Sequence, residues 1–187
     1  MTKDKTEIEA RLVALIRKGD RKAPEEVYRA YAGYLTGVCT RYLSDSMDVK
    51  DTLHDSFLKI IPALPSFEYR GSGSLRAWLT RIVMHESLKS LRRAYRFETL
   101  DDTADTIADP IDEPPLLGVT PEALHTMIRS LPVGYRTVLN LYLFEQKSHR
   151  EIAQLLHIKE ASSASQYHRA KAMLARSIRQ YQSQNSR

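Results

Sequence analysis

The stretch from Ser148 to Lys171 reads SHREIAQLLHIKEASSASQYHRAK, and it has the pattern of a helix-turn-helix. Apolar residues between Ile152 and Ile158 recur at helical spacing, and the small Ala153 lets a second helix approach. The second helix is rich in serine, whose small side chain allows close approach to the walls of the DNA major groove. The pattern favours contact with DNA over its alternative, a helical hairpin with a solvated serine-rich face.

The segment before this motif has the composition of a linker. Residues 97–120 contain seven acidic side chains and no lysine or arginine, together with three prolines and one glycine. Such a segment without periodic apolar residues is typical of a flexible tether. We therefore divide the 187 residues into a domain at 1–96, an acidic linker at 97–120 and a domain at 121–187. The formal net charge of the whole chain is +5, although the linker holds seven acidic side chains and no basic one. The two domains together are therefore basic, which indicates an anionic partner such as nucleic acid.

Both domains are predicted to be helical, because the alternation typical of strands is almost absent. In the first domain, apolar periodicity and the positions of glycine and proline predict helices at 6–18, 24–43, 46–63 and 74–95. In the second domain they predict helices at 121–130, 133–144, 148–156 and 160–182. The expected fold class is all-α: two small helical domains joined by a flexible acidic linker, the second a helix-turn-helix domain.

The predicted helix at 74–95 carries a basic stripe. Arg81, His85, Lys89 and Arg92 follow spacings of four, four and three residues, and Trp78 lies just before them. Cations on a helix face can meet phosphates, and an aromatic ring can stack on a base. The preceding loop combines aromatic rings, an arginine and small hydroxyls, which could hold an unstacked base. A solvated helix face with a buried tryptophan is the alternative interpretation.

A third pattern lies in the predicted helix at 46–63. Asp51, His54 and Asp55 share one face of this helix, which is either an acidic surface that docks a basic partner or a plain solvated face. An adjacent His-Asp pair is also the core of a metal-dependent phosphohydrolase signature. The candidates for further ligands are His85 and His125, and neither stands beside a second acidic ligand in a pattern typical of such a site.

Composition excludes several other classes of protein. Cys39 is the only cysteine, so it forms no intramolecular disulfide or cysteine-rich zinc site, and we expect it in the core. Neither G-x-G-x-x-G nor G-x-x-x-x-G-K-[ST] occurs, so these phosphate-binding loops are absent. The sequence has no run of 18 apolar residues, so no membrane-spanning segment is predicted. The first residues lack a signal-peptide pattern, so we expect a cytoplasmic protein.

These segments together resemble bacterial RNA polymerase sigma factors of the extracytoplasmic-function (ECF) group. Residues 48–58 resemble the family's region 2.2, which docks on the coiled coil of the polymerase β′ subunit. Residues 69–93 resemble regions 2.3 and 2.4, which melt and read the −10 promoter element. Residues 130–139 resemble region 4.1, and the helix-turn-helix resembles region 4.2, which reads the −35 element and touches the β flap. The four segments occur in the family's order and cover nearly the whole chain.

The resemblance implies a role for each segment. Core polymerase would be bound by Asp48, Asp51, Leu53, Asp55, Phe57 and Leu58. The −10 element would be bound by Tyr69, Arg70, Ser72, Ser74, Arg76, Trp78, Arg81, His85, Lys89, Arg92 and Arg93. The −35 element would be bound by His149, Lys159, Ser162, Ala164, Ser165, Gln166, His168, Arg169 and Lys171. The resemblance further implies a transcription initiation factor that is not an enzyme, needs no metal or other cofactor, and binds core RNA polymerase, promoter DNA and an anti-sigma factor.

Several residues depart from the family's pattern. Lys50 makes the docking face one charge less negative, and His157 replaces the usual turn glycine, although a positive φ would disfavour histidine there. Ser163 stands where valine often fills the core, and Ala164 and Gln166 replace frequent basic residues, which predicts a less electrostatic −35 contact. Two alternatives stay open: a stand-alone helix-turn-helix regulator that binds duplex DNA without polymerase, and a His-Asp metal phosphohydrolase that needs bound metal.

Overall fold

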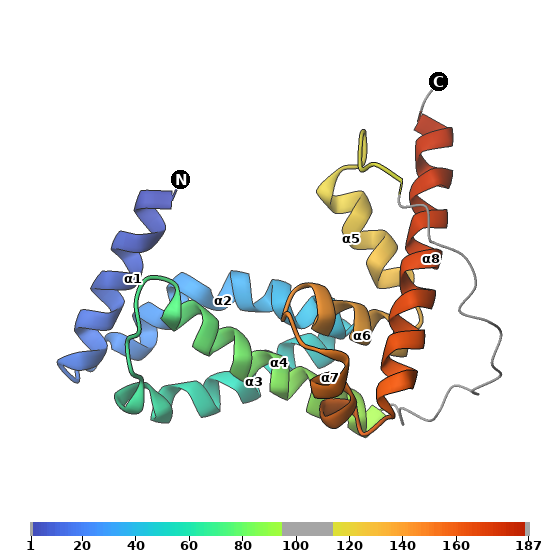
Figure 1. Cartoon of the computed structure of the whole chain (residues 1–187). Coiled ribbons are helices and arrows are strands. Elements are labelled where there is room, and N and C mark those ends of the chain that lie inside the picture. The colour runs from blue at the N-terminus through green and yellow to red at the C-terminus, as the bar shows by residue number, and fades with distance from the viewer. Residues whose placement is uncertain (1, 95–113, 186–187) are drawn as a thin grey trace. The chain divides into compact units, whose positions relative to one another are not determined.

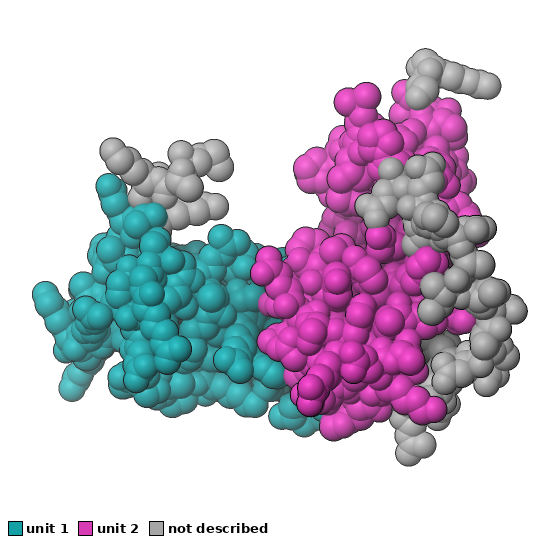
Figure 2. All heavy atoms as spheres, viewed as in Figure 1, with its two compact units in different colours: residues 1–94 teal, residues 95–187 magenta. Residues whose placement is uncertain are grey.

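The structure is a computed structural model that describes residues 2–94 and 114–185, with side chains for 6–93 and 114–185. These residues form eight α-helices and one short 3-10 helix, and no strand occurs among them, which confirms the all-α class (Figure 1). The chain divides into two compact units, residues 1–94 and 95–187 (Figure 2). Residues 97–113 of the predicted acidic linker lie outside the described residues.

The first unit consists of α1 (Thr2–Arg17), α2 (Ala23–Tyr42), α3 (Ser46–Ala63), the 3-10 helix η1 (Leu64–Ser66) and α4 (Ser74–Ala94). Helices α2, α3 and α4 pack against one another, and α1 packs against α2. Side chains that are fully buried in this unit include Leu12, Val27, Leu35, Val38, Leu75, Leu79 and Val83. Cys39 is buried as expected, and burial raises the pKa of its thiol to about 11.

Local signals explain where these helices begin and end. The Asp45 carboxylate caps α3, because it accepts hydrogen bonds from the backbone amides of Met47 at 2.7 Å and Asp48 at 3.1 Å. Pro24 lies in the first turn of α2, where a backbone N–H would have no acceptor within the helix, so proline costs no helical hydrogen bond. Gly19 follows α1 with a left-handed φ of 64°. For these reasons, most of the predicted helix bounds lie within one residue of the observed ones.

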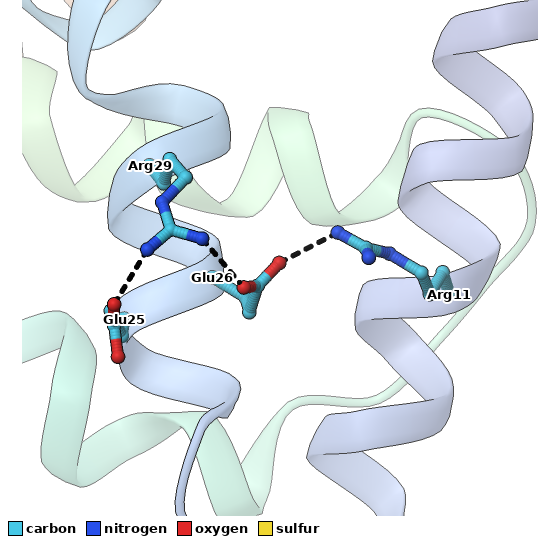
Figure 3. A network of polar contacts seen from close by, with 4 residues as sticks. All are labelled: Arg11, Glu25, Glu26 and Arg29. Carbon is cyan, nitrogen blue, oxygen red and sulfur yellow. Dashed lines mark hydrogen bonds and ion pairs between the residues drawn. The ribbon is translucent and has the colours of Figure 1, made fainter.

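A network of ion pairs joins α1 to α2 (Figure 3). Arg11 of α1 donates to the Glu26 carboxylate of α2 at 2.6 Å. Arg29 donates to Glu25 at 2.6 Å and to the other oxygen of Glu26 at 3.0 Å. Water screens exposed pairs of this kind, so each contributes about 0.2–1 kcal/mol to stability. The network therefore ties α1 to α2 without adding much free energy.

The second unit consists of α5 (Pro121–Ser130), α6 (Val133–Leu143), α7 (His149–Leu156) and α8 (Glu160–Asn185). Helix α8 packs against the other three helices of the unit. The core cluster contains Ile128, Leu131, Leu139 and Ala170, with Leu124, Tyr135, Tyr167 and Leu174 packed against it. Before α5, the side-chain amide of Gln182 donates to the carbonyl oxygens of Pro115 at 2.7 Å and Leu117 at 2.9 Å. These bonds attach the last part of the predicted linker to α8.

A capping box begins α7. The Ser148 hydroxyl accepts a hydrogen bond from the Glu151 amide at 3.3 Å, and the Glu151 carboxylate accepts one from the Ser148 amide at 2.9 Å. The Lys147 ammonium group donates to the same carboxylate at 2.9 Å. The contacts with Lys147 and Ser148 lower the pKa of Glu151 to about 2.

The lowered pKa predicts that Glu151 stabilises the second unit only while it is ionised. The pKa in the folded state lies below the ordinary value of 4.5, so the stabilisation is present above that value and is lost as the pH falls towards 2. We expect Glu151→Gln to be less stable than the unchanged chain at neutral pH, and the difference to shrink below about pH 4. Urea unfolding followed by circular dichroism measures both. A difference that stays constant with pH would contradict this assignment.

The turn between α7 and α8 has the backbone conformation that glycine usually adopts. His157 has a φ of 56° and a ψ of 43°, which is left-handed, as its place in the motif predicts. A side chain in this conformation costs about 1 kcal/mol relative to glycine. We therefore expect His157→Gly to raise the free energy of unfolding by about 1 kcal/mol, measured by chemical denaturation. His157→Ala, which keeps a Cβ, is the control and should give no such gain. A loss of stability in His157→Gly would show that contacts of the imidazole outweigh the backbone strain.

Candidate functional site

One side of α3 is an exposed acidic face. Asp48, Asp51 and Asp55 are all exposed on successive turns. Leu58, at the end of the same face, is 59% exposed, and Leu53 is half-buried. A large apolar side chain beside three carboxylates gives this face both charge and an apolar anchor, which suits docking of a protein partner.

The structure corrects the placement of Phe57. This side chain is only 5% exposed, so it cannot form part of a docking surface. Its ring packs against Tyr28 of α2, with the ring centres 4.7 Å apart. Tyr28 itself is 52% exposed. Sequence reasoning missed Tyr28 and also Met47 and Ile61 of α3, which are 60% and 42% exposed. Their apolar character at outward helical positions was the available signal.

The basic residues of α4 form an exposed surface. Arg81, His85, Lys89, Arg92 and Arg93 are all exposed. One buried carboxylate lies beside them: Glu86, whose side chain is 8% exposed, forms ion pairs with Lys59 of α3 and with Lys89 at 3.8 Å. The charge of Lys89 is therefore partly compensated within the unit.

The two charged surfaces share a border. Asp51 and Asp55 of α3 line one hollow of about 540 Å³ together with Lys89 and Arg93 of α4. Opposite charges therefore meet across this hollow. Any partner that binds one of the two surfaces changes the electrostatic potential at the other.

The loop before α4 owes its shape to glycine. Gly71 and Gly73 have φ values of 115° and 87°, which residues with a Cβ atom rarely adopt. Tyr69 is 37% exposed, and the Arg17 guanidinium lies 5.6 Å from the centre of its ring. Arg70 is exposed and pairs with Glu68 at 3.2 Å. The loop thus presents an aromatic ring and a cation to solvent, together with the exposed Ser72.

Two aromatic contacts hold the beginning of α4. Trp78 is half-buried, with its ring centre 5.4 Å from that of Phe67, and it lines a hollow together with Arg81 and His85. An aromatic surface beside two cations can stack on a base while the cations meet phosphates. The exposed Arg76 is less available, because its guanidinium lies 4.2 Å from the ring centre of Tyr34.

Buried Glu9 of α1 completes this region. Its carboxylate is 5% exposed and accepts hydrogen bonds from the backbone amides of Gly73 at 2.6 Å and Leu75 at 2.8 Å. The Ser74 side chain between them is half-buried, and its hydroxyl accepts from the Arg70 amide at 3.3 Å. Sequence reasoning missed Glu9, because its partners lie more than 60 residues away in the chain.

Helix α8 separates into an inner and an outer face. Of the predicted −35 residues, Lys159 is exposed, and Ala164, Ser165, His168, Arg169 and Lys171 are half-buried. The Arg169 guanidinium donates to the Tyr135 hydroxyl at 3.4 Å, which connects α8 to α6. The Lys171 ammonium group lies 5.7 Å from the ring centre of Tyr167. These outer residues stay candidates for DNA contact.

Ser162 and Gln166 do not belong to that outer face. Each is only 6% exposed, so the structure corrects the prediction that they read bases. Steps of four residues place Ser162, Gln166 and Ala170 on one side of the helix, and Ala170 belongs to the core cluster of the unit. Ser163 is also fully buried, in agreement with its place in the family's pattern, where valine fills the core.

His149 takes part in packing between α7 and α8. Its Nδ1 atom lies 3.0 Å from the Ser163 hydroxyl, and its half-buried ring stacks on Tyr142 with the ring centres 4.8 Å apart. These contacts hold the imidazole at the joint between the two helices. His149 therefore has a structural role, and the DNA contact predicted for it would have to be made by a side chain that these packing contacts already hold.

Neither a metal-binding cluster nor a membrane-spanning helix occurs among the described residues. In residues 2–94 and 114–185, no group of three or more histidine, cysteine, aspartate or glutamate side chains is arranged to hold a metal ion. His54 and Asp55 lie exposed on α3. None of the described helices is both long and apolar enough to cross a bilayer.

Comparisons with known proteins match both units. Residues 27–97 match the family model for sigma-70 region 2, and residues 121–174 match that for sigma-70 region 4. The RNA polymerase sigma-H factor of Pseudomonas aeruginosa is 26% identical over 92% of this chain and 94% of its own length. The ECF RNA polymerase sigma-E factor of Haemophilus influenzae is 27% identical over 89% and 93%. The solved structure of CnrH in complex with the cytosolic domain of CnrY has a TM-score of 0.48 and 22% identity over 90% of this chain and 96% of that chain.

Proposed function

The chain belongs to the ECF group of RNA polymerase sigma factors and directs transcription initiation, and we propose which of its residues carry out each step. The observation that carries the proposal is the order of the matches: region 2 falls in the first unit, and region 4 falls in the second. As a sigma factor, the chain binds core RNA polymerase and promoter DNA. The residue roles below are supported by exposure and charge.

The acidic face of α3 is proposed to dock on the β′ coiled coil of core polymerase. Asp48, Asp51 and Asp55 would supply the charge, and Leu58 would supply an exposed apolar anchor. Phe57 is left out of this proposed surface, because it is buried.

Helix α4 and its preceding loop are proposed to bind the melted −10 element. Arg81, His85, Arg92 and Arg93 would meet the phosphates of the separated strand, and Lys89 would contribute less because of its pairing with Glu86. The loop at 69–74 would capture a flipped base, whose unstacking costs a few kcal/mol. Contacts with the exposed loop side chains and with Trp78 would offset that cost.

The outer face of α8 is proposed to enter the major groove at the −35 element. Ser165 and His168 lie on that face, Arg169 stands half-buried at its border, and Lys159 and Lys171 would meet the flanking phosphates. Region 4 would also touch the β flap. We further propose that the chain has no catalysis of its own, acts in the cytoplasm, where transcription takes place, and is regulated by an anti-sigma factor, as its family implies.

Reconstitution with core polymerase tests the proposed function. The chain is mixed with purified core RNA polymerase, and run-off transcription is carried out on a pool of genomic fragments from the source organism. We expect discrete transcripts that require the chain, and the −35 and −10 sequences follow from their alignment. Specific binding to duplex DNA in the absence of polymerase, without such transcripts, would favour a stand-alone helix-turn-helix regulator instead.

A further inference from the structure

Helix α4 begins without a cap from its own sequence. The first amides of a helix have no partner within the helix, and a side chain just before it usually accepts from them. The residue just before α4 is Gly73, which has no side chain to act as a cap. Its φ of 87° is one that residues with a Cβ atom rarely adopt. The next residue, Ser74, uses its hydroxyl to accept from the Arg70 amide at 3.3 Å. The Ser74 amide donates to the Gly71 carbonyl oxygen at 3.1 Å, but the amides of Gly73 and Leu75 need an acceptor from elsewhere.

Glu9 of α1 supplies that acceptor. One carboxylate oxygen accepts from the Gly73 amide at 2.6 Å, and the other accepts from the Leu75 amide at 2.8 Å. Bonds between an ionised acceptor and backbone amides are short and strong, and the positive end of the α4 dipole favours the negative charge. A side chain that is only 5% exposed is held in one place. Glu9 thus joins the last glycine of the loop and the first turn of α4 in a single contact.

The surroundings of the carboxylate fit this role. Glu9 lines a hollow with Tyr31 and Tyr34 of α2 and with Arg76 and Gly73. Burial and, to a smaller extent, the negative charge of Glu9 raise the pKa of the Tyr31 hydroxyl to about 12, so this group stays protonated. The Tyr31 hydroxyl therefore adds no second negative charge to this hollow, and both oxygens of Glu9 accept from the backbone of the loop and of α4.

We infer that Glu9 is a positioning residue for −10 recognition: it holds the loop at 69–74 in the shape that captures the flipped base. This inference rests on the proposed function of that loop. It adds α1 to the −10-reading part of the protein, although the match to sigma-70 region 2 begins only at residue 27. A loop that is already ordered binds its ligand without first losing conformational freedom, so a weaker Glu9 contact lowers the fraction of binding-competent molecules.

Glu9→Gln is the direct test. The glutamine amide oxygen can still accept from one backbone N–H, but its NH₂ group faces the other N–H as a second donor. Arg11→Ala is the matched control, because it removes the ion pair between α1 and α2 and leaves the Glu9 contact in place. Hydrogen exchange on each whole chain reports the loop directly. We expect faster exchange at Gly73 and Leu75 in Glu9→Gln than in Arg11→Ala.

The functional readout uses the reconstituted holoenzyme. Its probe is a single-stranded oligonucleotide with the non-template −10 sequence taken from the run-off transcripts. We expect Glu9→Gln to weaken binding of this oligonucleotide by about tenfold, which corresponds to a binding-competent fraction of about one in ten. Glu9→Asp, which keeps the charge, should recover part of the loss. Binding of core polymerase and of a duplex −35 element should stay unchanged in both variants.

The outcomes separate positioning from general support of the fold. A selective loss of −10 binding, with faster exchange in the loop, would support the inference. An equal loss of core polymerase binding would show that Glu9 supports the whole unit, and it would overturn the inference, as would unchanged −10 binding in Glu9→Gln. If the unchanged chain yields no promoter-specific transcript with core polymerase, the proposed function itself fails.

Discussion

Asp51→Arg is expected to weaken binding to core RNA polymerase by about 100-fold and to leave the fold intact. Asp51 is exposed at the centre of the acidic face of α3, between Asp48 and Asp55. Arginine at this position replaces an attraction with a like-charge contact, and such a contact at an interface costs several kcal/mol. The measurement is fluorescence anisotropy of the N-terminally labelled chain titrated with purified core polymerase. Thermal unfolding followed by circular dichroism checks the fold.

Two further variants define the origin of this effect. Glu7→Arg makes the same change of charge at an exposed position of α1, away from the docking face, and it should alter core binding little. Lys50→Glu adds an acid to α3 and should strengthen core binding, more so at low salt. If Asp51→Arg binds core polymerase as tightly as Glu7→Arg does, the α3 face is not the docking surface.

Core binding in this experiment must be measured without DNA. Asp51 lines the same hollow as Lys89 and Arg93 of α4. Arginine at position 51 therefore adds positive charge next to the residues that are proposed to hold the −10 strand, and it could strengthen DNA contact while it weakens docking. A transcription assay alone would mix the two effects, whereas titration with core polymerase isolates the first.

The elements of the fold could be predicted from the sequence because their signals are local. Asp45 caps α3 within three residues, Pro24 lies in the first turn of α2, and the Ser148–Glu151 capping box begins α7. His157 was the position where the motif and the residue disagreed, and the backbone there is left-handed despite the histidine. The spacing of the motif therefore determines the turn more strongly than the preference of one residue does.

The parts of the candidate site that could not be predicted depend on contacts between distant segments. Phe57 is an exception, because two residues after Asp55 it stands on the opposite side of α3 from the acidic face, and helical spacing alone predicts its burial; in the structure it packs against Tyr28 of α2. Gln166 has the chemistry of a base-reading residue, yet it shares its side of α8 with Ala170 and is buried. Glu9 contacts a loop that lies 64 residues further along the chain. Sequence periodicity gives the faces of one helix, but the choice of the buried face depends on which helices pack against it.

Arg169→Ala is expected to weaken −35-dependent promoter binding by about 10- to 100-fold. Arg169 is half-buried at the border between the buried and outer faces of α8, and its guanidinium donates a hydrogen bond to the Tyr135 hydroxyl at 3.4 Å. A guanidinium held in one orientation loses less conformational entropy when it contacts a base, and a good bidentate contact contributes about 1–3 kcal/mol of discrimination. The measurement compares holoenzyme binding to a duplex promoter with binding to the same duplex carrying a scrambled −35 element.

The pattern of the loss identifies what Arg169 contacts. If its guanidinium reads a base, Arg169→Ala loses affinity for the intact −35 element but little affinity for the scrambled duplex. If it meets a phosphate, both duplexes lose affinity equally, and the slope of log K against log salt falls by about one. Arg176→Ala is the matched control, because Arg176 is exposed on the same helix seven residues further along. Equal affinities of Arg169→Ala and Arg176→Ala for the intact element would remove Arg169 from the −35 interface. A selective loss would place the outer face of α8 in the major groove, since an arginine reaches the guanine edge most readily from that side.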